Sequence, residues 1–493
     1  MCGIAAFYAY HYAAPEIDAE ELRGVREAMA PRGPDGCGEW MSPDGRAGLA
    51  HRRLSIIDLT DRAAQPMANE DSSVVLSFNG EIYNYRELRE GLAGRGARFR
   101  SDSDTEVLLR LYLEKGEKMF SDLRGMFALA VWDGPRRRLL LARDPYGIKP
   151  LYYADDGWSV RAASQVRALL ACGKVSRAPE PAGHAGFFLL GSVPEPFTLY
   201  QDIRQVPAGS YVTFSETGAR APVSYFSVAS VFAGGRSPAG DENAAESARA
   251  AFADSVRAHL VADVEVGLFL SAGVDSGALL GLAAEAGPRA PRAVTLAFEE
   301  YRGTASDESP LAARTAAAYG AEHLVRTLAF EEFSSEMTRF LAAMDQPTID
   351  GVNTYFVSRA AREAGLKVAL SGVGADELLG GYPSFREVPR AVSWAGPAAR
   401  VPFVGAVSAA ALRRLLPAGR EKWAGLLRYA GSYAGAYYLK RGLFLPWELP
   451  ALLGEEASRE GLRRLCVVRH LRAALSPEPG SAFGRVAALE SSC

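Results

Sequence analysis

Short apolar runs separated by turn residues fill the first part of the chain. The runs GLAHRRLSIIDL, SSVVLSFNGEIYN, FALAVWD, RLLLARD and PLYYADD are bounded by Gly, Pro, Asn and Asp, which is typical of strands. Apolar residues at helical spacing in 85–94 and 104–116 predict amphipathic helices between these strands. From Gly3 to about Thr213 the pattern therefore predicts an α+β domain of layered antiparallel sheets and helices.

The pattern changes after about Asp241. A helical stretch at 242–260 leads to the apolar strand VEVGLFL, a turn that contains glycine, and a helix at 277–286. The strands AVTLAF, HLVRTL and KVALSG follow, with helical stretches between them. Strands that are apolar on both faces and alternate with helices indicate a parallel α/β sheet. From about residue 386 the chain is rich in Ala, Leu and Arg, which predicts a helical C-terminal extension.

These changes of pattern predict two domains. Residues 227–241, SVASVFAGGRSPAGD, are small and polar and have no period, so they are the best candidate for a linker. We predict a first domain at 1–213, a linker at 214–241 and a second domain at 242–493.

Composition and charge exclude several classes of protein. The chain has 493 residues, 48% of them hydrophobic, which suits two full cores and excludes a disordered chain. The net charge is −3, with 55 basic and 58 acidic residues, and gives no reason to expect a nucleic acid or a membrane as partner. The five scattered cysteines form no C-x-x-C pair, and the start MCGIAAFYAY has no basic region. We therefore expect a soluble protein of the reducing cytoplasm.

Cys2 is the most informative single residue. A small residue after the initiator Met normally allows that Met to be removed, and Cys2 would then carry both a thiol and a free α-amine. The thiolate is the nucleophilic form of cysteine, and an α-amine of pKa near 8 can serve as its base. A lone Met-Cys is more often a chance cysteine, so this residue alone does not identify a site.

The motifs that follow give Cys2 a context. RGPDG, HRRLSIID, FNGEIYN, SDSDTEV, GMFALAVWD and RDPYGIKPLYY resemble, in order and spacing, the class II glutamine amidotransferase domain of asparagine synthetases. The resemblance covers almost all of residues 1–210. It implies an N-terminal-nucleophile fold and release of ammonia from glutamine at Cys2.

The resemblance also implies how glutamine is held. Glutamine is a zwitterion, so its pocket needs a cation and an anion; the resemblance gives the carboxylate to Arg53 and the ammonium to Asp104. It places the oxyanion hole at the Asn79 side chain and the Gly80 backbone N–H, with Glu81 nearby. Pro31 stands where the family usually has His, and Gln165 where an acidic residue is usual. The resemblance puts neither in the pocket, so we expect hydrolysis to survive.

A second candidate site begins with GLFLSAGVDSG. Its Ser271-Ala272-Gly273-Val274-Asp275-Ser276 resembles the S-G-G-x-D-S loop of ATP pyrophosphatases, which release AMP and pyrophosphate. Small residues let backbone N–H groups close around phosphate, and a helix N-terminus adds its dipole. Serine at such a position can also be a simple helix cap. No Walker-type G-x-x-x-x-G-K-[ST] loop occurs.

A partner motif supports the nucleotide site. VALSGVGADELLGGYPSF, at 368–385, resembles the asparagine-synthetase signature. The resemblance makes Asp275 and Asp376 the Mg²⁺ ligands, with Glu377 in support, and places Ser271, Gly273, Asp275, Ser276, Ser371 and Gly372 around ATP. It also places Asp307-Glu308, Asp345-Gln346-Pro347 and Asn353-Thr354 along the acceptor pocket.

Together the motifs imply a two-domain, glutamine-hydrolysing asparagine synthetase: a glutaminase joined to an ATP-dependent carbon–nitrogen ligase that converts aspartate to asparagine. The cofactors implied are ATP and Mg²⁺, the substrates are glutamine and aspartate or another small carboxylate, and a homodimer is usual for bacterial relatives. Family members also pass ammonia between the domains through a tunnel.

Two departures keep alternatives open. Val373 stands in SGVGAD where asparagine synthetases often carry an acidic residue, which keeps open an amide- or β-lactam-forming synthetase with another carboxylate acceptor. The family's S-M-A-x-S-x-E-x-R-x-P stretch and its lysine do not occur before Cys493, so we expect a C-terminally incomplete second domain. That leaves a third possibility, a glutaminase or regulatory module whose synthetase half is inactive.

Overall fold

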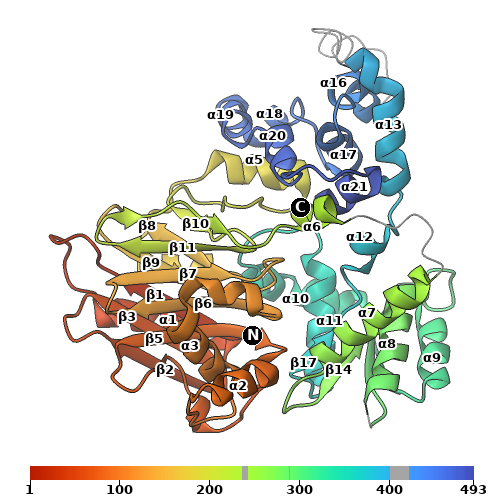
Figure 1. Cartoon of the computed structure of the whole chain (residues 1–493). Coiled ribbons are helices and arrows are strands. Elements are labelled where there is room, and N and C mark those ends of the chain that lie inside the picture. The colour runs from red at the N-terminus through yellow and green to blue at the C-terminus, as the bar shows by residue number, and fades with distance from the viewer. Residues whose placement is uncertain (236–242, 288, 400–420, 493) are drawn as a thin grey trace.

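The amino-terminal half is built on two antiparallel sheets. The computed structural model describes residues 1–235, 243–287, 289–399 and 421–492 (Figure 1). The first sheet, in the order β10-β8-β9-β1-β3-β2, consists of β1 (Gly3–Tyr8), β2 (Gly36–Met41), β3 (Ala47–Arg53), β8 (Tyr152–Asp155), β9 (Val160–Ala163) and β10 (Ile203–Gln205). The second, in the order β12-β11-β7-β6-β5-β4 with β13 also paired to β11, consists of β4 (Met67–Ala68), β5 (Val74–Ile82), β6 (Gly125–Asp133), β7 (Arg138–Arg143), β11 (Ser210–Ser215), β12 (Gly218–Ala219) and β13 (Val223–Ser224).

The alternation of side chains along β1 explains the layers. Ile4, Ala6 and Tyr8 pack into the core between the two sheets. Ala5 and Phe7, on the other face of the same strand, pack under the helices that cover the first sheet. These helices are α1 (Ala19–Ala28) and α4 (Val166–Ala171), while α2 (Tyr85–Gly94) and α3 (Asp104–Lys115) cover the second sheet. The predicted α+β domain of layered antiparallel sheets is confirmed.

The second half contains a parallel sheet. Its order is β16-β15-β14-β17, and each pair of neighbours is parallel. The strands are β14 (Val266–Phe269), β15 (Arg292–Phe298), β16 (Glu322–Leu328) and β17 (Val368–Leu370). The helices of this part are α7 (Ala244–His259), α8 (Val274–Ala286), α9 (Ser309–Ala318), α10 (Phe330–Ala343), α11 (Gly351–Glu363) and α12 (Ala375–Leu379). The parallel sheet and its alternating helices are as predicted. Helix α8, however, begins at Val274, three residues before the expected start at 277 and directly after Gly273 of the turn.

The helical C-terminal region packs on the amino-terminal half as well as on its own half. It comprises α13 (Ser384–Ala399), α15 (Glu421–Ala424), α16 (Leu426–Tyr429), α17 (Tyr433–Arg441), α18 (Leu449–Leu453), α19 (Glu455–Leu465), α20 (Val467–Ala473) and α21 (Ala482–Glu490). Its hydrophobic core includes Ala182, Ala185 and Leu189 of α5 (Pro181–Leu190). The Arg464 guanidinium also pairs with the buried Glu180 carboxylate at 2.7 Å. The predicted helical extension is therefore confirmed for 386–399 and 421–492, while 400–420 lie outside the described residues.

The segment predicted as a linker contains regular structure. Strands β12 and β13 lie within 214–224, and α6 (Val228–Gly234) follows them. Val228 and Ala229 of α6 are buried in the core of the C-terminal helices, so two apolar residues in a small, polar segment gain structure from tertiary packing. Residues 236–242 of the predicted linker lie outside the described residues. The exact domain boundaries stay a prediction.

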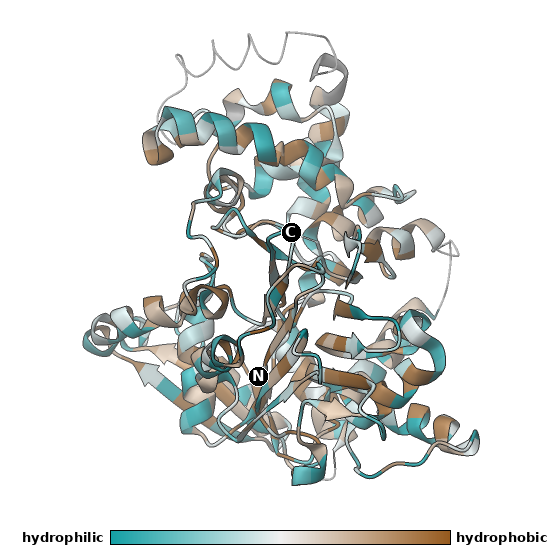
Figure 2. Cartoon of the chain, turned by 90° about the vertical axis from the view of Figure 1, so that its left-hand side faces the viewer, coloured by the Kyte–Doolittle hydropathy of each residue, from teal (hydrophilic) through white to brown (hydrophobic). Residues whose placement is uncertain are grey.

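Figure 2 shows hydrophobic residues on the interior strands and mixed hydropathy along the outer helices. In the described part of the chain, no helix has the length and apolar character needed to cross a membrane.

Candidate active site

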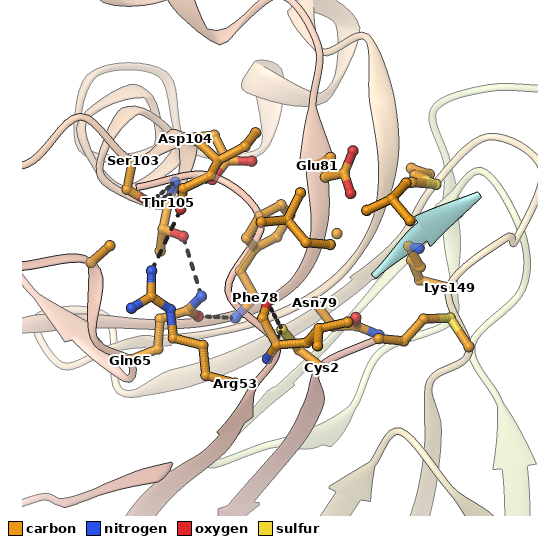
Figure 3. Close-up of a pocket in the computed structure, with 18 of the residues that line it drawn as sticks. Cys2, Arg53, Gln65, Phe78, Asn79, Glu81, Ser103, Asp104, Thr105 and Lys149 are labelled. Carbon is orange, nitrogen blue, oxygen red and sulfur yellow. Dashed lines mark hydrogen bonds between the residues drawn. The ribbon is translucent and has the colours of Figure 1, made fainter. Parts of the chain in front are cut away.

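The two halves meet around Cys2. A pocket of about 320 Å³ is lined by residues of the amino-terminal half together with Lys367, Val368 and Ala369 of the second half (Figure 3). Cys2 comes directly before β1, whose pairing with β3 sets Gly3 opposite Arg52. This register brings the thiol beside Leu54, whose backbone N–H lies 3.3 Å from the sulfur.

The electrostatics around Cys2 are set by burial and by nearby positive groups. Burial raises the pKa of the thiol, while the Leu54 N–H and the terminal ammonium of Met1 act to lower it. Burial lowers the pKa of the Met1 amine to about 6, so the charged form that lowers the thiol pKa is the minor form of this amine at pH 7. The Arg32 Nε donates to the Cys2 carbonyl at 2.9 Å and fixes the backbone of the nucleophile.

Asn79 and Gly80 lie on β5 in the wall of the same pocket. Asn79 is 1% exposed, and its Nδ2 has no hydrogen-bond partner among the described residues. A buried donor without an acceptor costs free energy, so it is a donor available for a ligand. A Cβ at Gly80 would stand 2.1 Å from the Met126 carbonyl oxygen, so only glycine allows β6 to approach so closely.

The charged residues expected to hold glutamine surround the thiol from other sides of the pocket (Figure 3). The Arg53 guanidinium is held by the Thr60 carbonyl at 2.9 Å and by the Asp58 carbonyl. Asp104 begins α3, and its Oδ2 accepts from the Ile82 N–H at 3.0 Å. Burial, with the nearby Glu81 adding to it, raises the pKa of Asp104 to about 7.

Lys149 also lines the pocket. It lies in the motif RDPYGIKPLYY, but the sequence alone assigned it no role. The side chain is buried, and in the described part of the chain its ammonium has neither a hydrogen bond nor an ion pair. Burial lowers the pKa of Lys149, and Glu81, Asp144 and Cys2 act to raise it. Its backbone is fixed by a 2.9 Å hydrogen bond to Asp144. The signal available in the sequence was the position of this lysine within a motif that resembles the family.

The predicted nucleotide loop joins β14 to α8, as a phosphate-binding loop requires. The Ser276 hydroxyl accepts from the Ser271 N–H at 3.1 Å and lies 2.9 Å from the Ser271 hydroxyl. The Gly273 N–H donates to the Ser271 Oγ at 3.1 Å, and the Ala272 N–H donates to Glu308 at 3.2 Å. These bonds close the loop into a tight turn.

The second signature lies against this loop. A Cβ at Gly372 would stand 3.2 Å from the Ser276 nitrogen, so the turn after β17, which begins at Ser371, packs on the first loop. Burial raises the pKa of Asp275, and the carboxylates of Asp376 and Glu377 raise it further. The structure thus brings together the predicted carboxylates from two strand ends.

This carboxylate group fits a hard divalent cation. Such a cation favours oxygen ligands and would relieve the repulsion from Asp376 and Glu377 that adds to burial in raising the Asp275 pKa. Among the described residues, no three acidic, His or Cys side chains are arranged to enclose a metal by themselves. A Mg²⁺ ion here would therefore complete its coordination with phosphate oxygens and water.

Two residues expected in the acceptor pocket have contacts elsewhere. The Asp345 carboxylate accepts from the Val166 and Arg167 N–H groups at the amino end of α4, at 2.8 and 3.0 Å. Gln346 accepts from the Leu199 N–H at 3.1 Å. Both therefore hold the two halves together, Asp345 by accepting from the free N–H groups in the first turn of α4 and Gln346 by accepting from Leu199. Glu308, in contrast, does reach the nucleotide loop through Ala272.

Comparison with known proteins agrees with this geometry. Residues 1–226 match the model of the glutamine amidotransferase domain, and residues 247–474 match the asparagine synthase model. Glutamine-hydrolysing asparagine synthetase 1 of Bacillus subtilis is 37% identical over 392 residues, 78% of this chain and 60% of that protein. A putative glutamine-hydrolysing asparagine synthetase of Mycobacterium tuberculosis (strain H37Rv) is 36% identical over 404 residues, 78% of this chain and 61% of that protein. Amidase chry2 of Gibberella zeae is 31% identical over 410 residues, 78% of this chain and 60% of that protein.

The chain spans about 60% of the length of these relatives. The two matched models follow each other along the chain in the same order as the two sites described above. The chain therefore belongs to the asparagine synthase family of glutamine amidotransferases, in which a glutamine amidotransferase domain precedes an asparagine synthase domain.

Proposed function

We propose that the protein is a glutamine-dependent asparagine synthetase. The observation that carries the proposal is one pocket in which three features meet: the Cys2 thiol, the Asn79 Nδ2 that has no partner among the described residues, and strand β17 of the synthase half. Glutamine hydrolysis at Cys2 would then release ammonia directly beside the synthase half, which uses it. The glutaminase residues are Cys2, Asn79, Gly80, Arg53, Glu81 and Asp104, and the nucleotide residues are Ser271, Gly273, Asp275, Ser276, Ser371, Gly372 and Asp376.

In the glutaminase step, the Cys2 thiolate attacks the side-chain amide carbon of glutamine. The Asn79 Nδ2 and the Gly80 N–H stabilise the oxyanion, the amide nitrogen leaves as ammonia, and a thioester remains. Water then hydrolyses the thioester to glutamate and restores the thiol. After removal of Met1, the α-amine of Cys2 accepts the thiol proton and returns it to the amide nitrogen as that nitrogen leaves.

In the synthetase step, an oxygen of the acceptor carboxylate attacks the α-phosphorus of ATP and pyrophosphate leaves. Ammonia attacks the resulting acyl-adenylate and AMP leaves, which yields the amide. The backbone of the loop from Ser271 to Ser276 would hold phosphate oxygens. Asp275 and Asp376 would hold Mg²⁺, which when bound neutralises the charge of the departing pyrophosphate.

A specific observation supports a second acceptor class. Val373 is 85% exposed and stands between Gly372 and Asp376, next to the nucleotide loop. A valine can neither deprotonate an attacking amine nor pair with a charged group. One of the relatives is named an amidase. The second candidate is therefore an amide-forming synthetase whose acceptor is a carboxylate other than aspartate.

One incubation tests these proposals. The purified protein receives ATP, Mg²⁺ and aspartate with either glutamine or ammonium, and asparagine, glutamate, AMP and pyrophosphate are measured together. Equal amounts of asparagine and AMP from both nitrogen donors support the synthetase. AMP that forms only with another carboxylate supports the second candidate, and glutamate without AMP means that the synthetase half is inactive.

The same proposal includes the cytoplasm as location and a homodimer as assembly. Cys2, Cys37, Cys172 and Cys466 are all free thiols, which fits a reducing compartment. Fractionation of cells and the mass of the particle in solution test the two statements.

A further inference from the structure

Strand β17 belongs to the synthase half and also forms part of the wall of the Cys2 pocket (Figure 3). Val368 and Ala369 of this strand face the pocket, and Lys367 precedes them. At its other end the strand leads into Ser371 and Gly372 of the nucleotide site. A strand of three residues therefore lines the glutamine pocket and leads directly into two residues of the nucleotide site.

Lys367 makes an ion pair with the amino-terminal half. Its Nζ lies 2.8 Å from Oδ2 of Asp35, in the motif RGPDG. The same Oδ2 accepts a hydrogen bond from the Ser55 N–H at 2.9 Å. The ammonium and the hydrogen bond both hold the pKa of Asp35 below its ordinary value, against its burial. Asp35 is thus an anion shared between the two halves.

The segment from Leu54 to Asp58 positions the glutamine site. Its Leu54 N–H reaches the Cys2 sulfur, and the carbonyl of Asp58 holds the Arg53 guanidinium. The synthase half contacts this segment at a second place, because Oδ2 of Asp263 accepts from the Asp58 N–H at 2.7 Å and the Asp263 N–H donates to the Ile56 carbonyl at 2.9 Å. Through Lys367 on one side and Asp263 on the other, the synthase half holds the segment at both ends.

We propose that Lys367 is a positioning residue of the glutamine site, supplied by the synthase half. It acts through Asp35 and Ser55 on the segment that aligns Arg53 and Cys2. The inference rests on the proposed function, since it assigns the pocket to glutamine. The glutaminase half then has a complete glutamine site only when β17 is docked against it.

The test compares full-length Lys367→Met and Lys367→Arg with the wild type. The matched control is Asp254→Asn, which breaks another ion pair between the halves, Arg124–Asp254 at 2.6 Å, whose residues do not line the pocket. Glutamine kcat and KM, thermal stability, and the rate of Cys2 alkylation by iodoacetamide, followed by peptide mass spectrometry, are measured for each protein.

We expect Lys367→Met to raise the glutamine KM about tenfold, because Arg53 is no longer held in place to receive the glutamine carboxylate. The kcat should change less than the KM. Lys367→Arg should restore the KM, since arginine also pairs with a carboxylate. Asp254→Asn should leave both constants unchanged. A general loss of stability would not produce this split between KM and kcat or its rescue by arginine.

The outcomes separate the two proposals. If the wild type hydrolyses glutamine and Lys367→Met keeps its KM, the positioning role is wrong while the glutaminase stands. If the wild type hydrolyses no glutamine, the proposed function fails, and the alkylation rate decides the positioning role. The positioning role is supported if Cys2 of Lys367→Met is alkylated at a rate that differs from the rates in both the wild type and Asp254→Asn. Equal alkylation rates in the three proteins overturn it.

Discussion

The Oδ2 atom of Asp345, in the synthase half, lies 2.8 Å from the backbone nitrogen of Val166, at the amino end of α4 in the amidotransferase half. Oδ1 of the same carboxylate accepts from the Arg167 N–H at 3.0 Å. A carboxylate at this end of a helix satisfies free N–H groups and interacts favourably with the helix dipole. Gln165, the N-cap residue of α4, stands where the family usually has an acidic residue. An acidic side chain there would add a second carboxylate beside Asp345.

Asp345→Ala should weaken the contact between the two halves. The substitution leaves two N–H groups without their acceptor, which costs about 1–3 kcal/mol for a buried group. Urea denaturation followed by fluorescence measures the change, with Asp350→Ala as the matched control. Asp350 is in the same loop, but its side chain does not cap the following helix. Equal stabilities of the two variants would contradict the role assigned to Asp345.

Cys2→Ala should abolish synthesis with glutamine and leave synthesis with ammonium unchanged. The thiol is the nucleophile of the glutaminase step, whereas ammonium bypasses that step. Parallel assays with the two nitrogen donors measure the effect, and Cys37→Ala is the control because Cys37 is outside the pocket. Retention of the glutamine-dependent reaction in Cys2→Ala would contradict the assignment.

Asn79→Ala should lower the glutaminase kcat by roughly 10²–10³-fold, the usual effect of losing one oxyanion donor, with a smaller change in KM. The buried Nδ2 already lacks a partner among the described residues, so the substitution removes no hydrogen bond that holds the fold. Steady-state glutamate formation measures both constants. Asn69→Ala, in a turn outside the pocket, serves as control. A kcat within about threefold of the wild type would exclude Asn79 from the oxyanion hole.

Asp275→Asn and Asp376→Asn should each suppress formation of pyrophosphate while glutamine hydrolysis continues. Each change removes a negative ligand from the group that fits Mg²⁺. Pyrophosphate release and glutamate formation are measured in the same samples over a series of Mg²⁺ concentrations. A higher Mg²⁺ requirement in the variants supports metal binding, and unchanged pyrophosphate release contradicts it.

The sequence predicted the parts of the site that depend on local pattern. The Ser271–Ser276 loop follows an apolar strand, and Asn79-Gly80 lies in an alternating strand, so both could be placed from the residues around them. The fold class followed from the change in hydrophobic period near residue 241. Cys2 gained its meaning from the motifs that follow it.

The remaining features depend on contacts between distant residues. Lys367 is separated by 332 positions from Asp35, and Asp345 by 179 from Val166, and no local pattern indicates that either pair meets. Helix α6 forms in a small, polar segment because the C-terminal helices bury Val228 and Ala229. Lys149 lines the same pocket as residues that are distant from it in the sequence, including Val368 and Ala369 of β17.

The glutamine kcat/KM should rise with pH through about 7, because the Asp104 carboxylate must be ionised to receive the α-ammonium of glutamine. Burial raises the pKa of Asp104 to about 7, so the group is largely protonated at pH 6 and largely ionised at pH 8. The ratio kcat/KM reports the free enzyme, in which this shift applies. Glutamate formation from pH 5.5 to 8.5, measured for the wild type and Asp104→Asn, tests the prediction. The variant should lose most of its affinity and the rise near 7. A rise that persists unchanged in Asp104→Asn would assign the titration to another group, of which the α-amine and the Cys2 thiol are the nearest.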